Sequence, residues 1–328
     1  MSRTPTVSVC MITYNHEKYI KEAIEGVLMQ QCNFDLELVI ANDCSTDETD
    51  AIVKDIIKNH PEAFKIYYYN QKRNVGVMAN FLFALNQCKG KYIAMCEGDD
   101  YWITTDKLKK QVNILENNKD VGLVYSNFKH FIQNKSEWVD IPPRFENNRQ
   151  EIIPKMLKSK FIEFPTTVFR KSILMKILTN LGKEFQDSII GDTRILLETV
   201  YFTKIYFLDE VTTVYRIHDE SVSHPKEVNK YICTLKDSYL LRKNFVKRYK
   251  LNELWLSHSI CNTNRALINK AFYSKKFHHT IIYLKSILII DTVKYCEWKV
   301  FRAKINSRIL IKLFFAIFGL GVLWQKIK

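Results

Sequence analysis

The chain has 328 residues, enough to bury one large core or two smaller ones, and its 47% hydrophobic and 26% charged residues exclude intrinsic disorder. The net charge of +14 is not spread evenly. Residues 225–328 hold 21 Lys/Arg and 5 Asp/Glu, a net of +16, whereas residues 1–224 hold 28 and 30, a net of −2. We therefore expect a near-neutral catalytic domain, residues 1–225, and a basic extension, residues 226–328, that faces an anionic partner.

The N-terminus and the cysteines predict the compartment. Residues 1–6 are polar and lack the apolar core of a secretory signal, so we expect no export. The eight cysteines are scattered without a CxxC pair, and several lie in or beside apolar segments. This pattern favours reduced core thiols in a cytosolic protein over a disulfide framework.

Strand and helix patterns alternate through the first 126 residues. Buried strands are predicted at 7–12, 36–41, 66–69, 92–96 and 121–125, and helices at 16–29, about 47–59, 77–88 and 106–117. Repeated β-α units with short connections are typical of an α/β domain with a mostly parallel sheet and helices on both faces. Residues 127–165 are less regular, and a helix-rich basic segment begins near residue 231.

Polar clusters follow four of these strands, at residues 13–15, 42–47, 71–76 and 97–100. Because ligands of parallel sheets bind outside the carboxyl ends of the strands, we expect the four clusters to line one crevice.

Three carboxylates, Glu97, Asp99 and Asp100, surround a glycine at the end of the strand at 92–96. Carboxylates gathered there repel one another and lose hydration, and a divalent cation is the usual compensation. On this interpretation Asp99 holds the metal, while Glu97 and Asp100 assist with ribose binding, coordination or orientation. The alternative is a solvated turn or a helix N-cap, where acidic residues with glycine are also common.

The other clusters offer groups that suit a nucleotide. Asp43 follows a buried strand, where its carboxylate is placed to accept the imide N–H of a uracil or thymine, and the residues after it form an ordinary helix start. Tyr14 is placed to pack on a base, and Thr13 and Asn15 to meet ribose or phosphate. Asn74 and Gly76 form a turn whose glycine permits close approach of the backbone to the ligand. Each cluster, taken alone, is equally consistent with a polar turn.

In this order, the runs Thr13-Tyr14-Asn15, Asn42 to Asp47, Asn74-Val75-Gly76 and Glu97 to Trp102 resemble family 2 glycosyltransferases. The resemblance covers residues 5–224 and leaves the C-terminal hundred residues outside it. It implies the GT-A fold and inverting transfer of a sugar from a nucleotide donor, with a uridine diphosphate sugar as the default. It also implies a divalent cation, Mn²⁺ or Mg²⁺, as cofactor.

Two further segments extend the resemblance. Asp192, ahead of an amphipathic helix, is implied as the catalytic base, although Gly191 stands where the family often has an acidic or amide residue. Asp187 is the fallback, and the alternative role of Asp192 is to cap the helix. In the run from Tyr215 to Ser223, His218 is implied as a metal ligand and Arg216 or Ser223 as a diphosphate contact.

The residues that bind the acceptor are harder to identify from the sequence. The segment Phe164 to Arg170, including Thr167, is expected to line it, and Trp102 to stack on a sugar ring, although an aromatic residue there is as often packing. The apolar run 309–324 is too short to cross a bilayer, so we expect it to lie in the membrane interface, beside basic residues. A buried helix or an oligomer contact is the alternative.

The resemblance implies a metal-dependent glycosyltransferase. Together with the basic C-terminal segment, it leads us to expect a role in cell-surface polysaccharide synthesis, peripheral at the cytoplasmic face of the membrane. Its partners would be the nucleotide-sugar donor, a glycan or lipid-linked acceptor and anionic lipid. A catalytically inactive sugar-binding relative is the first alternative. A nucleic-acid-binding protein is the second, but it leaves the four polar clusters unexplained.

Overall fold

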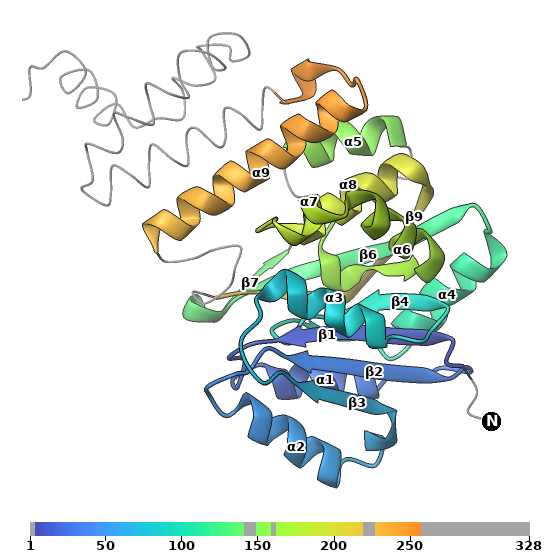
Figure 1. The fold of residues 1–328 in the computed structure, drawn as a ribbon. Helices are drawn as coiled ribbons and strands as arrows, with labels where there is room; N and C mark the ends of the chain where they lie inside the picture. Colours follow the sequence, from blue (N-terminus) through green and yellow to red (C-terminus); the bar gives the residue numbers. More distant parts are fainter. Residues whose placement is uncertain (1–3, 141–148, 159–161, 219–226, 257–328) are drawn as a thin grey trace, which may run out of the picture. The chain divides into compact units, whose positions relative to one another are not determined.

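The computed structural model describes residues 4–140, 149–158, 162–218 and 227–256 (Figure 1). The chain divides into two compact units, one of residues 1–156 and 160–221 and the other of residues 157–159 and 222–328. The domain boundary expected after residue 225 and the apolar run 309–324 both lie outside the described residues. They therefore stay predictions.

The first unit is built on one sheet that contains, among the described residues, nine strands. Their order is β3-β2-β1-β4-β8-β6-β9-β5, and β7 pairs with β6. The strands are β1 (Val7–Thr13), β2 (Leu36–Asn42), β3 (Ile66–Asn70), β4 (Tyr92–Met95), β5 (Tyr101–Trp102), β6 (Val121–Ile132), β7 (Glu137–Asp140), β8 (Val168–Arg170) and β9 (Lys204–Ile217).

The α/β class is confirmed, but the sheet is mixed rather than mostly parallel. Strands β1 to β4 run parallel, as the β-α pattern predicts. The other half contains β8, which is antiparallel to both β4 and β6, and β5, which is antiparallel to β9. Neither β5 nor β8 is longer than three residues, too short to show the alternation by which strands are found in a sequence.

Helices flank the sheet on both faces (Figure 1). The helices of the first unit are α1 (Ile20–Leu28), α2 (Thr49–Asn59), α3 (Val77–Gln87), α4 (Lys107–Asn117), α5 (Arg149–Lys158, whose last two residues belong to the second unit), α6 (Lys171–Leu181), α7 (Lys183–Gln186) and α8 (Gly191–Phe202). Short 3-10 turns lie at η1 (Ala63–Lys65), η2 (Gln133–Lys135) and η3 (Phe164–Thr166).

The main apolar core lies between the sheet and α1, α2 and α4. It takes Val9 and Met11 from β1, Leu38 and Ile40 from β2, and Ile24 from α1. These side chains are fully buried, and each contributes roughly 1.5–3 kcal/mol by leaving water. Because α3 packs against β1 and β2 as well, these strands are mostly apolar and buried along nearly their whole length, which fixes where their carboxyl ends lie.

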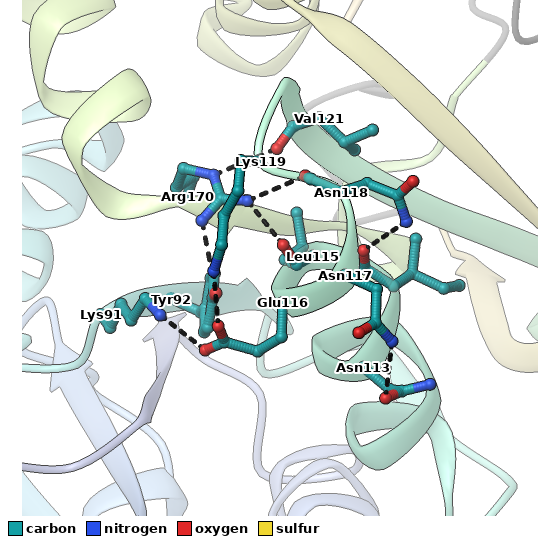
Figure 2. Close-up of polar contacts among 11 residues, drawn as sticks. Lys91, Tyr92, Asn113, Leu115, Glu116, Asn117, Asn118, Lys119, Val121 and Arg170 are labelled. Atoms are coloured by element: carbon teal, nitrogen blue, oxygen red, sulfur yellow. Dashed lines mark hydrogen bonds and ion pairs between the residues drawn. The ribbon is translucent and has the colours of Figure 1, made fainter.

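Arg170, at the end of β8, joins the sheet to the C-terminus of α4, as Figure 2 shows. Its guanidinium donates hydrogen bonds to the carbonyl oxygens of Leu115 (2.7 Å), Asn118 (3.1 Å) and Val121 (3.1 Å) and to the hydroxyl of Tyr92 (3.3 Å). The last carbonyls of a helix have no partner within it, so one side chain satisfies several of them. Arg170 pairs with Tyr92 at the start of β4, away from the polar loop that follows this strand.

In the second unit the structure describes one long helix, α9 (Val228–Arg248), and the short turn η4 (Glu253–Leu256). The last turn of α9 carries Lys247 and Arg248, where positive charge is favourable at a helix C-terminus. Within the described ranges, α9 and the helices of the first unit are all too short or too polar to cross a membrane.

Candidate active site

The loops after β1 and β2 are joined by hydrogen bonds. Asn15 adopts a left-handed backbone (φ 56°), which asparagine tolerates better than most residues. Its N–H donates to Ser45 Oγ (2.9 Å), and its Oδ1 accepts the N–H of Thr46 (2.9 Å). Glu17 N–H donates to Asp47 Oδ2 (3.0 Å) in the same way. Two of the predicted nucleotide-binding clusters therefore form one surface, and the Asn15 side chain is used in holding them together.

Asp43 fixes a third cluster. Its carboxylate is buried and accepts the N–H of Val75 (2.7 Å) and of Gly76 (2.9 Å). Gly76 has a φ of 90°, so this turn needs glycine for its backbone conformation, and the close approach of its backbone to a nucleotide stays a prediction. Each carboxylate oxygen keeps a second acceptor position, so the predicted contact with a base stays available to Asp43.

Asp99 meets two histidines from distant parts of the chain. Its Oδ2 lies 3.0 Å from His218 Nε2, just past β9, and 3.8 Å from His16 Nε2, in the loop after β1. The Asp99 side chain is 18% exposed and that of His218 only 2%. His218 was predicted at this site and His16 was not. The available signal for His16 was its place directly after Thr13-Tyr14-Asn15.

The two neighbouring carboxylates have opposite electrostatic environments. Burial alone would raise the pKa of Asp99, but the charge of His16 and the hydrogen bond from His218 outweigh it and lower that pKa to about 2. For Asp100, burial first and then the charges of Asp99 and Glu97 raise the pKa well above its usual value. The negative charge of the pair is therefore concentrated on Asp99, which points at the histidines.

Arg216 holds the loop that carries Asp99 and Asp100 in place. Its N–H donates to Asp100 Oδ1 (2.8 Å), and its Nε–H donates to the carbonyl of Asp99 (2.8 Å). Its Nη2 pairs with Glu22 Oε2 of α1 (2.6 Å), and its Nη1 donates to Gln133 Oε1 (3.1 Å). Arg216 is 5% exposed, and its guanidinium N–H groups donate to protein acceptors. The guanidinium therefore supports the Asp99 backbone from inside the protein and does not face a diphosphate, which differs from the sequence prediction.

The chain approaches itself closely at Gly98. A Cβ at this position would lie 2.7 Å from Thr13 Oγ1 and 3.0 Å from His16 Nδ1. Glycine therefore allows the Asp99 loop to pack against the loop after β1. Thr13 itself is buried, and its hydroxyl has no hydrogen-bond partner among the described residues. A buried hydroxyl in that state is characteristic of functional sites, where a ligand or water completes the bonding.

Asp192 lies in the first turn of α8. Its Oδ1 accepts the N–H of the next residue, Thr193 (2.6 Å), and its side chain is partly exposed. The preceding Gly191 is packed: a Cβ there would lie 2.4 Å from Met78 Sδ and 2.8 Å from the Phe185 ring. The absence of an acidic side chain at 191 thus has a steric reason.

The remaining predicted residues divide by burial. Tyr14 is 42% exposed, Asn74 is exposed and Glu97 is partly buried, so these side chains border the surface of the site. Trp102 is 1% exposed, and its indole N–H donates to Pro165 O (2.9 Å). Its ring therefore belongs to the core and does not offer a face to a sugar. Thr167 is also buried, with its hydroxyl on Phe164 O (2.6 Å), and Ser223 lies outside the described residues.

The donor atoms at Asp99 fit a divalent cation that the substrate helps to bind. Two adjacent ligands of an octahedral Mg²⁺ lie about 3 Å apart, which matches the 3.0 Å between Asp99 Oδ2 and His218 Nε2. In the described part of the chain, no three His, Cys, Asp or Glu side chains are grouped closely enough to hold a metal by themselves. Mg²⁺ commonly takes its other ligands from water and substrate phosphates.

The sheet, its parallel half and the polar loops at the strand ends are those of an α/β domain that binds its ligand beyond the carboxyl ends of the strands. Residues 8–178, slightly more than half of the chain, match the model of glycosyl transferase family 2, and the chain belongs to this family.

Two curated proteins illustrate the similarity of this chain to known sequences. An uncharacterized glycosyltransferase of Methanocaldococcus jannaschii is 27% identical over 293 residues, 88% of this chain and 90% of that protein. An uncharacterized protein of Mycobacterium tuberculosis is 33% identical over 165 residues, 50% of this chain. The match spans only 47% of the length of the mycobacterial protein.

Solved structures share the fold. Staphylococcus aureus TarS, crystallised with UDP-GlcNAc, superposes with a TM-score of 0.52 at 16% identity, covering 80% of this chain and 81% of that one. A mannosyltransferase of Pyrobaculum calidifontis, in complex with GDP-Man and Mn²⁺, gives a TM-score of 0.50 at 16% identity, covering 99% of this chain and 89% of that one. At these identities the similarity establishes the GT-A arrangement of the sheet and helices.

Proposed function

We propose that this protein transfers a sugar, with inversion, from a nucleoside diphosphate donor to a hydroxyl group of a glycan or lipid-linked acceptor. The observation that carries the proposal is the convergence of Asp99, His218 and His16 beside the loops after β1 and β2. Membership of glycosyl transferase family 2 supports the reaction class. The donor is a uridine diphosphate sugar, in keeping with UDP-GlcNAc bound to TarS, although the structural relative from Pyrobaculum holds GDP-Man.

The chain would bind the donor with the surface formed by its first three loops. Asp43 would hold the base through its remaining acceptor positions, and Tyr14 would cover the ring. Asp99 and His218 would hold Mn²⁺ or Mg²⁺. When bound, this cation offsets the charge that develops on the departing diphosphate. Arg216 and Asp100 would keep the Asp99 carboxylate aimed at that position.

Asp192 would act as the general base. Its carboxylate takes the proton of the acceptor hydroxyl as that oxygen forms its bond to the anomeric carbon. The bond between the anomeric carbon and the diphosphate oxygen breaks on the opposite face, and the nucleoside diphosphate departs with the electron pair. Attack opposite the leaving group inverts the anomeric centre. A positioned general base contributes roughly 10²–10⁴-fold to the rate.

The charge of the basic extension bears on where the enzyme acts. Residues 225–328 carry a net charge of +16 and interleave large apolar residues with Lys and Arg. We propose that this segment holds the enzyme at an anionic membrane surface, where lipid-linked acceptors of cell-surface polysaccharides are found. Each basic residue near such a surface contributes up to about 1 kcal/mol. A packed helix would not need this excess of positive charge.

Substitutions of the three acidic residues test the proposed chemistry. With a panel of UDP- and GDP-sugars and Mn²⁺, we expect nucleotide release by the native enzyme, and a loss of at least 10²-fold in kcat for Asp192→Asn. Asp99→Asn should lose metal-dependent thermal stabilisation by the nucleotide sugar as well as activity. Asp187→Asn, an exposed neighbour of α8, is the matched control and should keep near-native kcat.

Circular dichroism would establish that each variant stays folded. Near-native turnover of both Asp99→Asn and Asp192→Asn would refute the assignment. Loss of kcat in Asp187→Asn alone would move the base to Asp187. Metal-dependent stabilisation of the native protein without any nucleotide release would instead favour a sugar-binding relative that lacks catalysis.

A further inference from the structure

Trp138 is an exposed aromatic residue on β7, which among the described strands pairs only with β6. Its side chain is 52% exposed, whereas Trp102, in the core, is 1% exposed. A tryptophan left in water forgoes a large part of the free energy that its burial would give, because it can bury 150–250 Å². Such a residue is more informative than a scattered leucine, and its surroundings show what it would bind.

The sheet register places Trp138 at the end of a row that leads to Asp99. Trp138 lies opposite Phe131 of β6, and Phe131 lies opposite Arg216 of β9, so the three side chains share one face of the sheet. The rings of Trp138 and Phe131 are 4.8 Å apart, and the Arg216 guanidinium is 6.0 Å from the Phe131 ring. Arg216 in turn donates to the carbonyl of Asp99.

The hairpin that carries Trp138 extends past the end of β4. Through β8, Ile93 of β4 is level with Leu123 of β6, so β6 residues beyond about 125 lie past the strand end where the Asp99 loop begins. Figure 1 shows β6 running on to β7 in this direction. Gln133, at the tip, accepts a hydrogen bond from Arg216 (3.1 Å), which fixes the hairpin relative to Asp99. Trp138 therefore lies beyond the carboxyl end of β4, at the edge of the sheet where ligands bind.

Charged groups stand beside the indole on the same face. Lys129 and Asp140 lie opposite each other, two positions along each strand from Phe131 and Trp138. Their side chains form an ion pair (3.5 Å) and are 44% and 85% exposed. A flat aromatic surface bordered by a donor and an acceptor matches a pyranose ring, which presents C–H groups on its faces and hydroxyls at its edge. A purely apolar ligand would make no hydrogen bonds with these two exposed groups.

The size of the surface also favours a small ring over a protein. A stable protein interface buries about 800 Å² on each partner, and one indole supplies at most about a quarter of that. The residues at the tip of the hairpin, from Gln133 to Glu137, are all polar, so no larger apolar patch adjoins the indole there. A single sugar unit needs no more than one aromatic face and a few hydrogen bonds.

From this arrangement we infer that Trp138, Lys129 and Asp140 form a subsite that binds one sugar ring of the acceptor glycan, outside the position where transfer takes place. The inference rests on the proposed glycosyltransferase activity and adds the class of acceptor: a chain of at least two sugars, one of which reaches the hairpin while another meets Asp192. A lone monosaccharide acceptor would not occupy both positions.

Titration by nuclear magnetic resonance tests the subsite directly. The protein has five tryptophans, and the indole N–H signal that disappears in Trp138→Phe identifies the signal of Trp138. We expect this signal to shift when chitotetraose, mannotetraose or cellotetraose is added to the full-length protein, while that of the buried Trp102 does not. Trp138→Ala should weaken binding of that oligosaccharide at least tenfold, and Trp138→Phe less.

Phe202→Ala is the matched control. Phe202 is 53% exposed and makes an edge-to-face contact with the Tyr201 ring (5.2 Å), but it lies before the start of β9, at the end remote from Arg216. Its loss should leave oligosaccharide affinity unchanged. Nucleotide-sugar stabilisation should be native in both alanine variants, because the proposed donor-binding residues lie in the loops after β1 to β4 and not at these two positions.

The outcomes separate the two proposals. If the native protein neither binds nor turns over any nucleotide sugar, the proposed function fails, and the subsite with it. If donor binding is intact but no oligosaccharide moves the Trp138 signal, or Trp138→Ala binds as tightly as the native protein, the subsite alone is wrong. A concentration-dependent dimer that Trp138→Ala abolishes would also overturn it, by assigning the indole to self-association.

Discussion

Lys107 is the residue whose charge is least compatible with its position. It is fully buried in α4, donates to Gln111 Oε1 (2.6 Å) and lies 4.4 Å from the centre of the Trp102 ring. Burial lowers the pKa of Lys107 to about 7. No carboxylate pairs with the ammonium in the described contacts. The free-energy cost of removing the ammonium from water is therefore offset only by neutral hydrogen bonds and the aromatic face of Trp102.

This position predicts a distinctive dependence of stability on pH. The unfolded-state pKa of lysine is about 10.4, so between pH 7 and 10 the unfolded chain binds a proton that the folded chain lacks. Stability contributed by Lys107 therefore rises with pH in this window, by roughly 2 kcal/mol between pH 7 and 9. Urea unfolding of Lys107→Met should lose this rise.

Lys109→Met provides the control on the same helix, since Lys109 is exposed. Its unfolding free energy should follow the native pH dependence. A rise of native size that persists in Lys107→Met would show that another group titrates. The substitution leaves Gln111 Nε2 bonded to Thr166 O (2.8 Å), so the local fold keeps its other anchor.

At the scale of elements, single side chains join parts of the chain that are distant in sequence. Arg216 ties β9 to α1, the Asp99 loop and the tip of the β6–β7 hairpin, and its bond to Glu22 spans 194 residues. Arg170 does the same for β8, β4 and the end of α4. Both use the planar fork of guanidinium donors, which a lysine cannot reproduce.

Replacing Arg170 should destabilise the sheet without affecting the site. Arg170→Met removes four hydrogen bonds and leaves carbonyl oxygens at the end of α4 without this donor, so we expect a loss of roughly 2–3 kcal/mol in unfolding free energy. Arg170→Lys should recover part of it. Chemical denaturation measures both.

Lys171→Met, which removes one hydrogen bond to Cys88 O (2.6 Å), should cost no more than about 1 kcal/mol. Donor binding by folded Arg170→Met should be native, because Arg170 of β8 lies opposite the start of β4 and Asp99 lies beyond the end of β4. Equal losses in Arg170→Met and Lys171→Met would contradict a bracing role for the guanidinium.

At the scale of the whole molecule, the parallel half of the sheet was predictable and the other half was not. Strands β1, β2 and β4 are mostly apolar and almost entirely buried, and the pattern that identifies them is local. The antiparallel β8 occupies three residues, and its place between β4 and β6 depends on contacts across the sheet. No periodicity in the sequence contains that information.

The same division applies to the site. Asp99 and His218 were placed together through their resemblance to a family, and their contact at 3.0 Å agrees with that placement. His16 was missed because its place after Thr13-Tyr14-Asn15 does not show that this loop packs against Asp99. Arg216 was assigned to the diphosphate, with Ser223 as the other candidate, through the same resemblance. Its partners Glu22 and Gln133 are identifiable only in the folded chain. The burial of an aromatic side chain is also poorly estimated from sequence. In the structure Trp102 is buried, so its ring packs in the core and does not stack on a sugar.

The distribution of charge leads to the last prediction. The net charge is −2 for residues 1–224 and +16 for residues 225–328, so an anionic surface should attract one end of the chain and not the other. In sedimentation with vesicles, we expect the full-length protein to bind phosphatidylcholine vesicles that contain phosphatidylserine at low salt. Binding should fall steeply at high salt, because the screening length shortens from about 10 Å at 0.1 M to about 3 Å at 1 M.

Vesicles of phosphatidylcholine alone separate the two contributions of the extension. Salt-resistant binding to these neutral vesicles would mean that apolar insertion, rather than charge, holds the protein. Single-stranded RNA is the competing polyanion: if it binds at the same salt concentration at which anionic vesicles do not, the positive charge serves nucleic acid and the membrane proposal is wrong. If vesicles win, turnover of a lipid-linked acceptor should rise when it is presented in an anionic bilayer, because enzyme and acceptor then share one surface.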